Sequence, residues 1–308
     1  MKFKNLKELM AKFTDETVCR EYMEKIFFPL GKPVCPFCQY SEKIWRIEGG
    51  KRYKCKQCLK KFSIMVGTIY ENSNIPLSTW FGALYLVTSH KKGISSIQLG
   101  KDLGVTQKTA WFMLHRIREM LKDKSPERLK NTVEIDETMI GGKEKNKHTK
   151  RKKEMLPYMG KTPVVGLVER GGNIYAQKID SISVGNIIPI IKSKVEEGAI
   201  IMTDENPTYT RLGREYAHFS VNHTDHKYVI GNAHTNTIEG FWSLLKRGIV
   251  GIYHNVSYKH LNKYCGEFAF RYNTRKMSES GRFDVSMAQS VGRRLKYQKL
   301  ISKNLVGG

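Results

Sequence analysis

The sequence predicts an α/β chain, α+β overall, made of a small cysteine-bearing module, a helical module and a larger domain built on a mixed sheet. Two Cys-x-x-Cys pairs lie near the N-terminus, a long helical pattern follows them, and strand and helix patterns alternate in the second half. The expected segments are residues 1–30, 31–65, 76–125, 130–275 and 276–308.

The composition is strongly basic. There are 53 Lys plus Arg against 29 Asp plus Glu in 308 residues, a formal net charge of +24. Such an excess indicates a polyanionic partner, with nucleic acid as the first expectation and a generally solvated basic surface or a ribosome-associated protein as alternatives. Because neither a long apolar run nor a secretory signal is apparent, we expect a cytoplasmic, nucleoid-associated protein with no membrane partner.

Residues 1–30 form a helical lead-in by their periodicity, which ends at Pro29 and Gly31. The two cysteine pairs in residues 31–65 are sixteen residues apart, within the spacing of four-cysteine zinc sites, and the stretch around Gly49-Gly50 between them indicates a hairpin. Four thiolates leave no open coordination position, so the Zn²⁺ would be structural. The module is therefore predicted to be a zinc ribbon with the ligands Cys35, Cys38, Cys55 and Cys58.

Residues 76–125 are expected to contain a helix-turn-helix. A helical pattern ends near Leu103, Gly104 supplies a turn, and Thr106 can cap a second helix. In DNA-binding proteins the N-terminal end of such a helix meets base edges, although helix hairpins with glycine turns also occur in proteins that never touch DNA. The expected DNA contacts are Gln107, Lys108 and Thr109.

The domain at 130–275 begins with an alternating acidic strand, residues 132–140, which places Glu134 and Asp136 on one face and Glu137 on the other. Seven Lys or Arg follow between positions 143 and 153. This block is expected to be a mobile loop that clamps a polyanion beside the carboxylates, unless it serves solubility alone. The residues expected to contact DNA there are Lys150, Arg151, Lys152 and Lys153.

Further elements complete a mixed sheet. The patterns predict strands at 163–170 and 173–179, a helix at 184–197, a buried strand at 198–204 that ends in Asp204, and a short strand at 218–223. An acid in the first strand and one at the carboxyl end of a neighbouring parallel strand can lie close together.

The stretch from His234 to Lys246 predicts a half-buried helix with Thr235 or Asn236 as its cap. Glu239 and Lys246 are seven residues apart, about two turns, so they project from the same side. Alone, they would be a surface ion pair. Beside two strand acids, however, Glu239 completes a set of three carboxylates that needs cations, and two Mg²⁺ ions about 4 Å apart suit phosphoryl chemistry.

Three blocks and the zinc ribbon resemble bacterial insertion-sequence transposases related to eukaryotic Merlin elements. The blocks are Val133-Glu-Ile-Asp-Glu-Thr-Met-Ile-Gly-Gly142, Thr203-Asp204, and Asn236-Thr-Ile-Glu-Gly-Phe-Trp-Ser-Leu-Leu-Lys246, which continues to Glu267-Phe-Ala-Phe-Arg-Tyr-Asn273. The resemblance, over about residues 20–275, implies a ribonuclease H-like catalytic domain with an acidic triad of the DDE type. Such an enzyme cuts transposon ends by divalent-metal-dependent hydrolysis and joins the freed 3′-hydroxyl to target DNA.

The resemblance further implies that Asp136 and Asp204 bind two Mg²⁺ ions, or Mn²⁺, and that the partners are transposon inverted repeats, target DNA and further copies of the chain. Relatives use either Asn or Glu as the third residue. We expect Glu239, because a carboxylate is the better Mg²⁺ ligand and Lys246, which would face phosphates, follows two turns later. Asn236 would cap the helix or bind phosphate. Of the nearby acids, Glu134 is expected to matter more than Glu137, since it shares the face of Asp136.

Two rival functions remain open at this stage. One is a non-catalytic DNA-binding regulator or domesticated relic that uses the ribbon and the helix-turn-helix alone. The other is a metal-dependent nuclease that cuts without joining. Residues 276–308 are expected to form a basic tail that tracks DNA or stays mobile.

Overall fold

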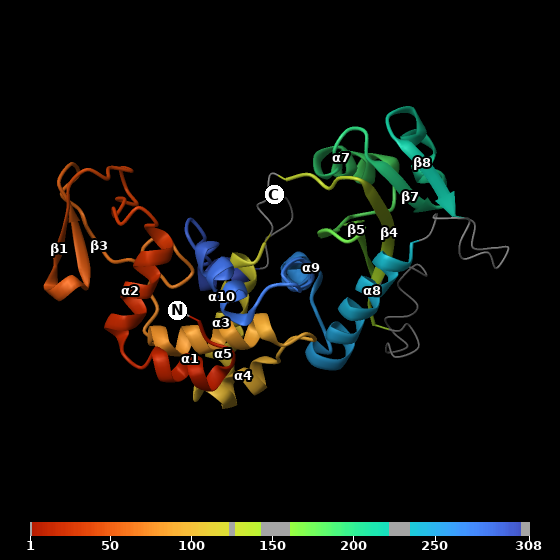
Figure 1. Ribbon diagram of the computed structural model, residues 1–308. Coiled ribbons are helices and arrows are strands. Elements are labelled where there is room, and N and C mark those ends of the chain that lie inside the picture. The colour runs from red at the N-terminus through yellow and green to blue at the C-terminus, as the bar shows by residue number, and fades with distance from the viewer. Residues whose placement is uncertain (1, 123–126, 143–160, 222–234, 303–308) are drawn as a thin grey trace. The chain divides into compact units, whose positions relative to one another are not determined.

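The computed structural model describes residues 2–122, 127–142, 161–221 and 235–302 (Figure 1). The chain divides into two compact units. Residues 1–121 with 276–308 form the N-terminal unit, and residues 122–275 form the sheet unit. Within the described ranges, no helix combines the length and the apolar character needed to cross a membrane.

The N-terminal unit is helical apart from its ribbon. Its helices are α1 (Leu6–Lys12), α2 (Glu16–Phe27), α3 (Leu77–Ser89), α4 (Ser96–Leu103), α5 (Gln107–Met120), α10 (Glu279–Ala288) and α11 (Tyr297–Ile301). As predicted, α4 ends at Gly104 in the left-handed region, with φ of 66°, and the Thr106 hydroxyl accepts a hydrogen bond from the Thr109 N–H to cap α5. The helix, glycine turn and second helix are therefore present as local structure.

Residues 276–302 differ from the expected basic tail, because they fold into the N-terminal unit. The ring of Phe283 in α10 is fully buried and contacts the rings of Phe3, Phe13 and Phe81. Met287, one turn later, is also fully buried. The prediction of a basic tail rested on the number of Lys and Arg residues. It did not take account of Phe283 and Met287, whose spacing places them on one face of a helix.

The ribbon is a three-stranded antiparallel sheet in the order β1-β2-β3. The predicted hairpin joins β1 (Ile44–Ile47) to β2 (Arg52–Cys55) through the short helix η1 (Glu48–Gly50), and a two-residue strand, β3 (Lys61–Phe62), adds an edge that no pattern predicted. The Tyr53 hydroxyl of β2 donates a hydrogen bond to the Glu24 carboxylate of α2. The ribbon is thus tied to the helix that precedes it.

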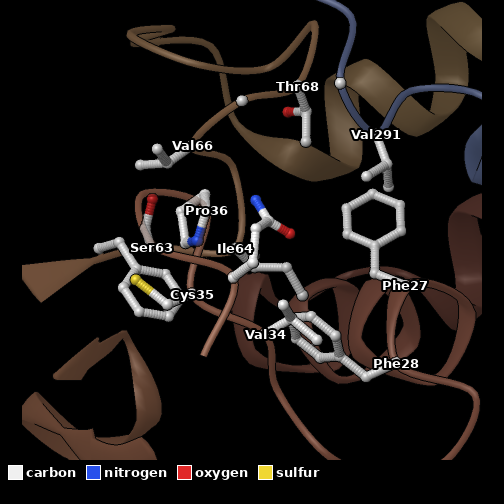
Figure 2. A pocket seen from close by; sticks show the side chains of 14 residues that line it. Phe27, Phe28, Val34, Cys35, Pro36, Ser63, Ile64, Val66, Thr68 and Val291 are labelled. Atoms are coloured by element: carbon white, nitrogen blue, oxygen red, sulfur yellow. The ribbon is translucent and has the colours of Figure 1, made fainter. Parts of the chain in front are cut away.

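An apolar pocket of about 380 Å³ lies beside the ribbon. Figure 2 shows Phe27, the last residue of α2, and Phe28, which follows it, lining the pocket together with Pro36 and Val291. None of its lining residues, all of which the structure describes, carries a charged side chain.

The sheet unit contains the predicted mixed sheet, with five strands in the order β6-β5-β4-β7-β8. β4, β5 and β6 pair antiparallel, whereas β7 runs parallel to both β4 and β8. The strands are β4 (Thr132–Gly141), β5 (Lys161–Glu169), β6 (Ile174–Lys178), β7 (Ile200–Asp204) and β8 (Ala217–Val221).

Helices cover both faces of this sheet (Figure 1). On one face, Val133 and Ile135 of β4 pack against Ile187 and Ile191 of α7. On the other, strand residues such as Val164 pack against α8 and α9. The helical elements are α7 (Val184–Lys194), η3 (Pro207–Arg214), α8 (Asn236–Gly248), η4 (Ile249–Tyr253), η5 (Tyr258–His260) and α9 (Leu261–Asn273).

Helix α7 ends three residues before the predicted position 197. Val195, the first residue after it, instead forms a parallel bridge with Leu129. This bridge lies just before β7 in the chain. Because Val195 pairs with Leu129, the helix ends earlier than the sequence pattern predicts.

A glycine allows α8 to approach the sheet closely. Gly166 of β5 lies opposite Asp136 of β4, and a Cβ atom at this position would lie 2.6 Å from the indole ring of Trp242. A larger residue here would push α8 outward. An isolated glycine in a strand is a known signal of such an approach.

Candidate functional site

The parallel pairing of β4 and β7 brings two of the predicted acids together. The paired residues run from Thr132 and Ile200 to Glu134 and Met202. Continued by two residues, this register places Asp136 level with Asp204. The adjacency expected from the sequence is therefore present, between the middle of β4 and the carboxyl end of β7.

Three carboxylates converge at this point. Asp136, Glu137 and Asp204, here called the acidic cluster, each offer one oxygen, and these oxygens all lie within 4.8 Å of one another. All three residues are half-buried. The backbone N–H of Asn206 donates to one oxygen of Asp204 at 3.1 Å, which fixes that side chain beyond the end of β7.

Asp136 is anchored by the helix that covers it. The indole Nε1–H of Trp242 in α8 donates to Asp136 Oδ2 at 2.9 Å. Burial raises the pKa of Asp136 above its ordinary value, and the charges of Asp204 and Glu239 raise it further. The site therefore holds negative charge at an electrostatic cost that a cation would relieve.

Glu137 reaches the cluster from the opposite face of β4. The Tyr209 hydroxyl donates to its Oε1 at 2.6 Å. Burial raises the pKa of Glu137 to about 7, with further contributions from the charges of Asp204 and Asp136. Glu137, and not Glu134, therefore belongs to the acidic cluster.

Glu134 has another task. Its carboxylate is fully buried and accepts hydrogen bonds from the backbone N–H groups of Thr237 and Ile238 at the start of α8. Arg170 donates to the same carboxylate at 2.7 Å. These oxygens are engaged by the protein itself. The capping of α8 by Glu134 also replaces the cap expected from Thr235 or Asn236, since Thr235 makes no side-chain cap bond.

The predicted site residues of α8 are exposed on its surface. Asn236 and Glu239 lie in the first turn and Lys246 in the last. The Thr235 hydroxyl donates to Glu239 at 3.3 Å. Glu239 is near enough to raise the pKa of Asp136, although it lies outside the acidic cluster as the described residues define it. Glu239 and Lys246, both described, form no ion pair with each other, so the surface-pair alternative lacks support.

The donor set of the acidic cluster suits a hard divalent cation. Mg²⁺ prefers oxygen ligands, takes one or two carboxylates per ion and retains several waters. Carboxylates held this close repel one another unless protons or cations lie between them. The three residues therefore fit Mg²⁺ or Mn²⁺.

The four predicted zinc ligands come together in the ribbon. The Sγ atoms of Cys35 and Cys58 are 3.6 Å apart, as are those of Cys38 and Cys55. All four Sγ atoms lie within 4.8 Å of one another. Tetrahedral zinc with bonds of about 2.3 Å requires sulfurs about 3.8 Å apart. The separations fit a structural Zn²⁺.

The two cysteine knuckles have matching backbones. The residue after each pair adopts a left-handed conformation, Gln39 with φ of 61° and Leu59 with φ of 57°. This turn lets the N–H of Cys35 bond the carbonyl of Tyr40, and the N–H of Cys55 bond that of Lys60. Each knuckle thereby presents two thiols to the same point.

The residues expected to bind DNA are only partly placed. Gln107 and Lys108 are exposed at the start of α5, and Thr109 is half-buried. Gln107 Nε2 donates to the Ser96 hydroxyl at 2.9 Å, and Lys108 Nζ lies 5.5 Å from the centre of the Tyr297 ring. Lys150, Arg151, Lys152 and Lys153, as well as His234, lie outside the described residues.

Comparison with known proteins gives two family matches. Residues 14–61 match the transposase zinc-ribbon domain, and residues 128–273 match the ISXO2-like transposase domain. The four cysteines lie within residues 14–61, and the acidic cluster lies within residues 128–273.

Two curated relatives are similar in sequence. The chain is 28% identical over 252 residues to an uncharacterized protein in the transposable element ISH50 of Halobacterium salinarum, which covers 77% of this chain and 84% of that protein. It is also 28% identical over 101 residues to an uncharacterized transposase-like protein of Haemophilus influenzae, over 32% of this chain and 80% of the relative.

Among solved structures, a pre-cleavage Mos1 transpososome matches with 14% identity and a TM-score of 0.29, over 68% of this chain and 78% of that one. A likeness at this TM-score is too weak to define the fold.

Loss of one cysteine thiolate should release the zinc. We expect the protein purified under reducing conditions to contain a single zinc ion per chain, and Cys38→Ser to lose it on dialysis against a chelator, because the remaining thiolates leave an open position. Metal analysis by mass spectrometry measures this. Cys19→Ala, at a buried cysteine outside the cluster, should retain zinc. Equal zinc retention in both variants would contradict the assignment.

Cation binding at the acidic cluster should tighten as the pH rises. The folded-state pKa of Glu137, about 7, lies above its ordinary value of 4.5, so at pH below 7 a cation must displace a proton that stabilises the folded state. The affinity for Mn²⁺ should therefore rise up to about tenfold per pH unit below 7 and level off above it. Isothermal titration calorimetry measures the slope. Glu137→Gln should flatten it, and an unchanged slope would exclude Glu137.

Proposed function

We propose that this chain, which combines a transposase zinc ribbon with an ISXO2-like transposase domain, is an active transposase of the DDE type. It binds transposon-end DNA, cleaves it by metal-dependent hydrolysis and joins the 3′-hydroxyl ends to target DNA. The observation that carries this proposal is the acidic cluster, formed by the middle of β4 and the end of β7 inside the matched transposase domain.

The strand order supports a ribonuclease H-like domain. Three antiparallel strands followed by two parallel ones, in the order β6-β5-β4-β7-β8, is the arrangement that such a domain requires. Its first strand, β4, carries Asp136, and its fourth, β7, ends in Asp204. The positions of the two proposed metal ligands on these strands support the proposal.

The side chains of the site divide the work. Two divalent cations, when bound, supply activation of the attacking oxygen and stabilisation of the leaving one. Asp136 and Asp204 would hold them, and the Trp242 indole N–H orients the Asp136 carboxylate through Oδ2. Glu137, kept in place by the Tyr209 hydroxyl, adds a third carboxylate from the other face of β4.

The third residue of the triad comes from α8 in this proposal. Glu239 is preferred to Asn236 because it is a carboxylate within electrostatic reach of Asp136. Lys246, two turns further along the exposed side, would bind a phosphate of the DNA. Asn236 would position the substrate beside it.

DNA is the proposed partner of the whole chain. The net charge of +24 favours a polyanion, and a recognition role for α5 would use Gln107 and Lys108, which are exposed at its N-terminal end, together with the half-buried Thr109. Lys150, Arg151, Lys152 and Lys153 would clamp the backbone near the cluster. Pairing of two inverted repeats would require more than one copy of the chain in the active complex.

Removing one strand acid should abolish catalysis and spare binding. Asp136→Asn should reduce Mg²⁺-dependent cleavage of a terminal inverted repeat by at least about 10³-fold, since it removes a metal ligand, while leaving DNA affinity unchanged. Gel assays of nicking and strand joining measure this. Asp180→Asn, the same change at an exposed aspartate of the sheet unit, is the matched control.

The same assays separate the rival functions. Retained cleavage in Asp136→Asn would contradict the catalytic assignment. DNA binding without cleavage by the unmodified protein would favour the regulator or relic. Production of 3′-hydroxyl ends that are never joined would favour a nuclease.

The two candidates in the first turn of α8 should rank differently. We expect Glu239→Gln to be inactive and Asn236→Ala only impaired, by about tenfold, because the first removes a proposed metal ligand and the second a polar contact. Cleavage rates at saturating Mg²⁺ give the ranking. The opposite order would make Asn236 the third residue of the triad.

A further inference from the structure

A buried carboxylate joins β4 to α8. The Glu134 side chain has no exposed surface. Oε2 accepts from the N–H groups of Thr237 at 2.9 Å and Ile238 at 3.1 Å, while Oε1 accepts from the Thr237 hydroxyl at 2.9 Å and from Arg170 Nε at 2.7 Å. Burial of a charge is costly unless hydrogen bonds and an opposite charge compensate it, and here both are present.

The Glu134 carboxylate acts as the N-terminal cap of α8. The first N–H groups of a helix have no intrahelical acceptor and carry a partial positive charge. Thr235, at the cap position, makes no side-chain cap bond. The charge and acceptors come instead from Glu134 on the neighbouring strand, so the start of the helix is fixed relative to β4.

A second tie lies two residues further along the same face of β4. Asp136 accepts a hydrogen bond from Trp242 Nε1, and Trp242 lies close to the strand because Gly166 has no side chain. One tie therefore holds the first turn of α8 and the other holds the middle of the helix. Asn236 and Glu239 lie in the first turn, next to the tie made by Glu134.

We propose that Glu134 is a positioning residue of the active site, which sets the place of the first turn of α8 relative to the acidic cluster. The inference rests on the proposed function, because it assumes that Glu239 or Asn236 acts together with Asp136 and Asp204. Glu134 touches neither cation nor DNA in this role. It acts through the backbone of Thr237 and Ile238.

The consequence is a selective loss of rate. In Glu134→Gln an amide replaces the carboxylate at nearly the same volume, so one acceptor and the charge are lost and the first turn of α8 is free to shift. A displacement of about 1 Å at a reacting centre can lower a rate by about 10²-fold. DNA affinity should stay unchanged, since Glu134 is buried.

The test compares Glu134→Gln with a variant that weakens the same unit elsewhere. Ile191→Val removes a methylene group from the core on the opposite face of the sheet, far from α8 in the packing. Melting temperatures of the full chain and cleavage rates at saturating DNA and Mg²⁺ are measured for both. At comparable melting temperatures, we expect the cleavage rate to fall by about 10²-fold in Glu134→Gln and by less than twofold in Ile191→Val. Equal rates in the two variants would overturn the proposal.

A second measurement reports the position of α8 without catalysis. The chain has four tryptophans, so indole-¹⁵N labelling gives four resonances, and Trp242→Phe identifies the one that belongs to Trp242. This resonance should shift in Glu134→Gln and stay in place in Ile191→Val. Thr237→Val removes only the hydroxyl donor to Glu134 and should shift the Trp242 resonance less, in the same direction. This variant replaces Glu134→Gln in the test if Glu134→Gln does not fold.

The two readouts separate failure of this inference from failure of the proposed function. If the unmodified protein does not cleave DNA, the proposed function fails, and the Trp242 resonance still decides whether Glu134 positions α8. If cleavage occurs but the resonance and the rate of Glu134→Gln are unchanged, the positioning role is wrong and the proposed function stands.

Discussion

The parallel pairing of β4 with β7 is the constraint on which the site depends. It places Asp136 and Asp204, which are 68 positions apart in the sequence, level with each other on neighbouring strands. Everything else in the sheet unit either stabilises that pairing or adds to it. The antiparallel strands β5 and β6 extend the sheet on one side, and helices on both faces bury its apolar residues.

The pairing has an electrostatic consequence. Asp136, Glu137 and Asp204 stand half-buried and close together, and burial raises the pKa values of Asp136 and Glu137. A protein with a net charge of +24 has ample basic residues to neutralise them, yet the cluster is built from carboxylates held by an indole, a phenol and a backbone N–H. Such neutral donors orient the acids without cancelling their charge, which suits a cation that arrives from solution.

The sequence allowed prediction of the parts whose signals are local. The four zinc ligands follow from spacing, the capped helix at Thr106 from its composition, and the adjacency of Asp136 and Asp204 from strand order. The interactions that were not predicted are long-range. The Glu134 cap and the Trp242 bond to Asp136 join residues about a hundred positions apart, and alternation alone could not reveal that the oxygens of Glu134 are already engaged.

Two predictions differ from the structure, and each difference has a physical cause. The segment at 276–302 was judged by its charge, whereas Phe283 and Met287 bury one face of α10. The face of Glu137, opposite that of Asp136, was predicted correctly, but its place in the acidic cluster was not, because alternation along a strand does not show how far a long side chain reaches. Gly166, in contrast, was a readable signal, since an isolated glycine in an apolar strand marks a close approach.

We propose above all that Asp136 in β4 and Asp204 at the end of β7 together hold a divalent cation. Anomalous diffraction from crystals of the full chain soaked in Mn²⁺ tests it most directly. We predict an anomalous peak between Asp136 and Asp204, at about 2.1 Å from an oxygen of each. Crystals that show bound Mn²⁺ only elsewhere, with both aspartates free of metal, would contradict it.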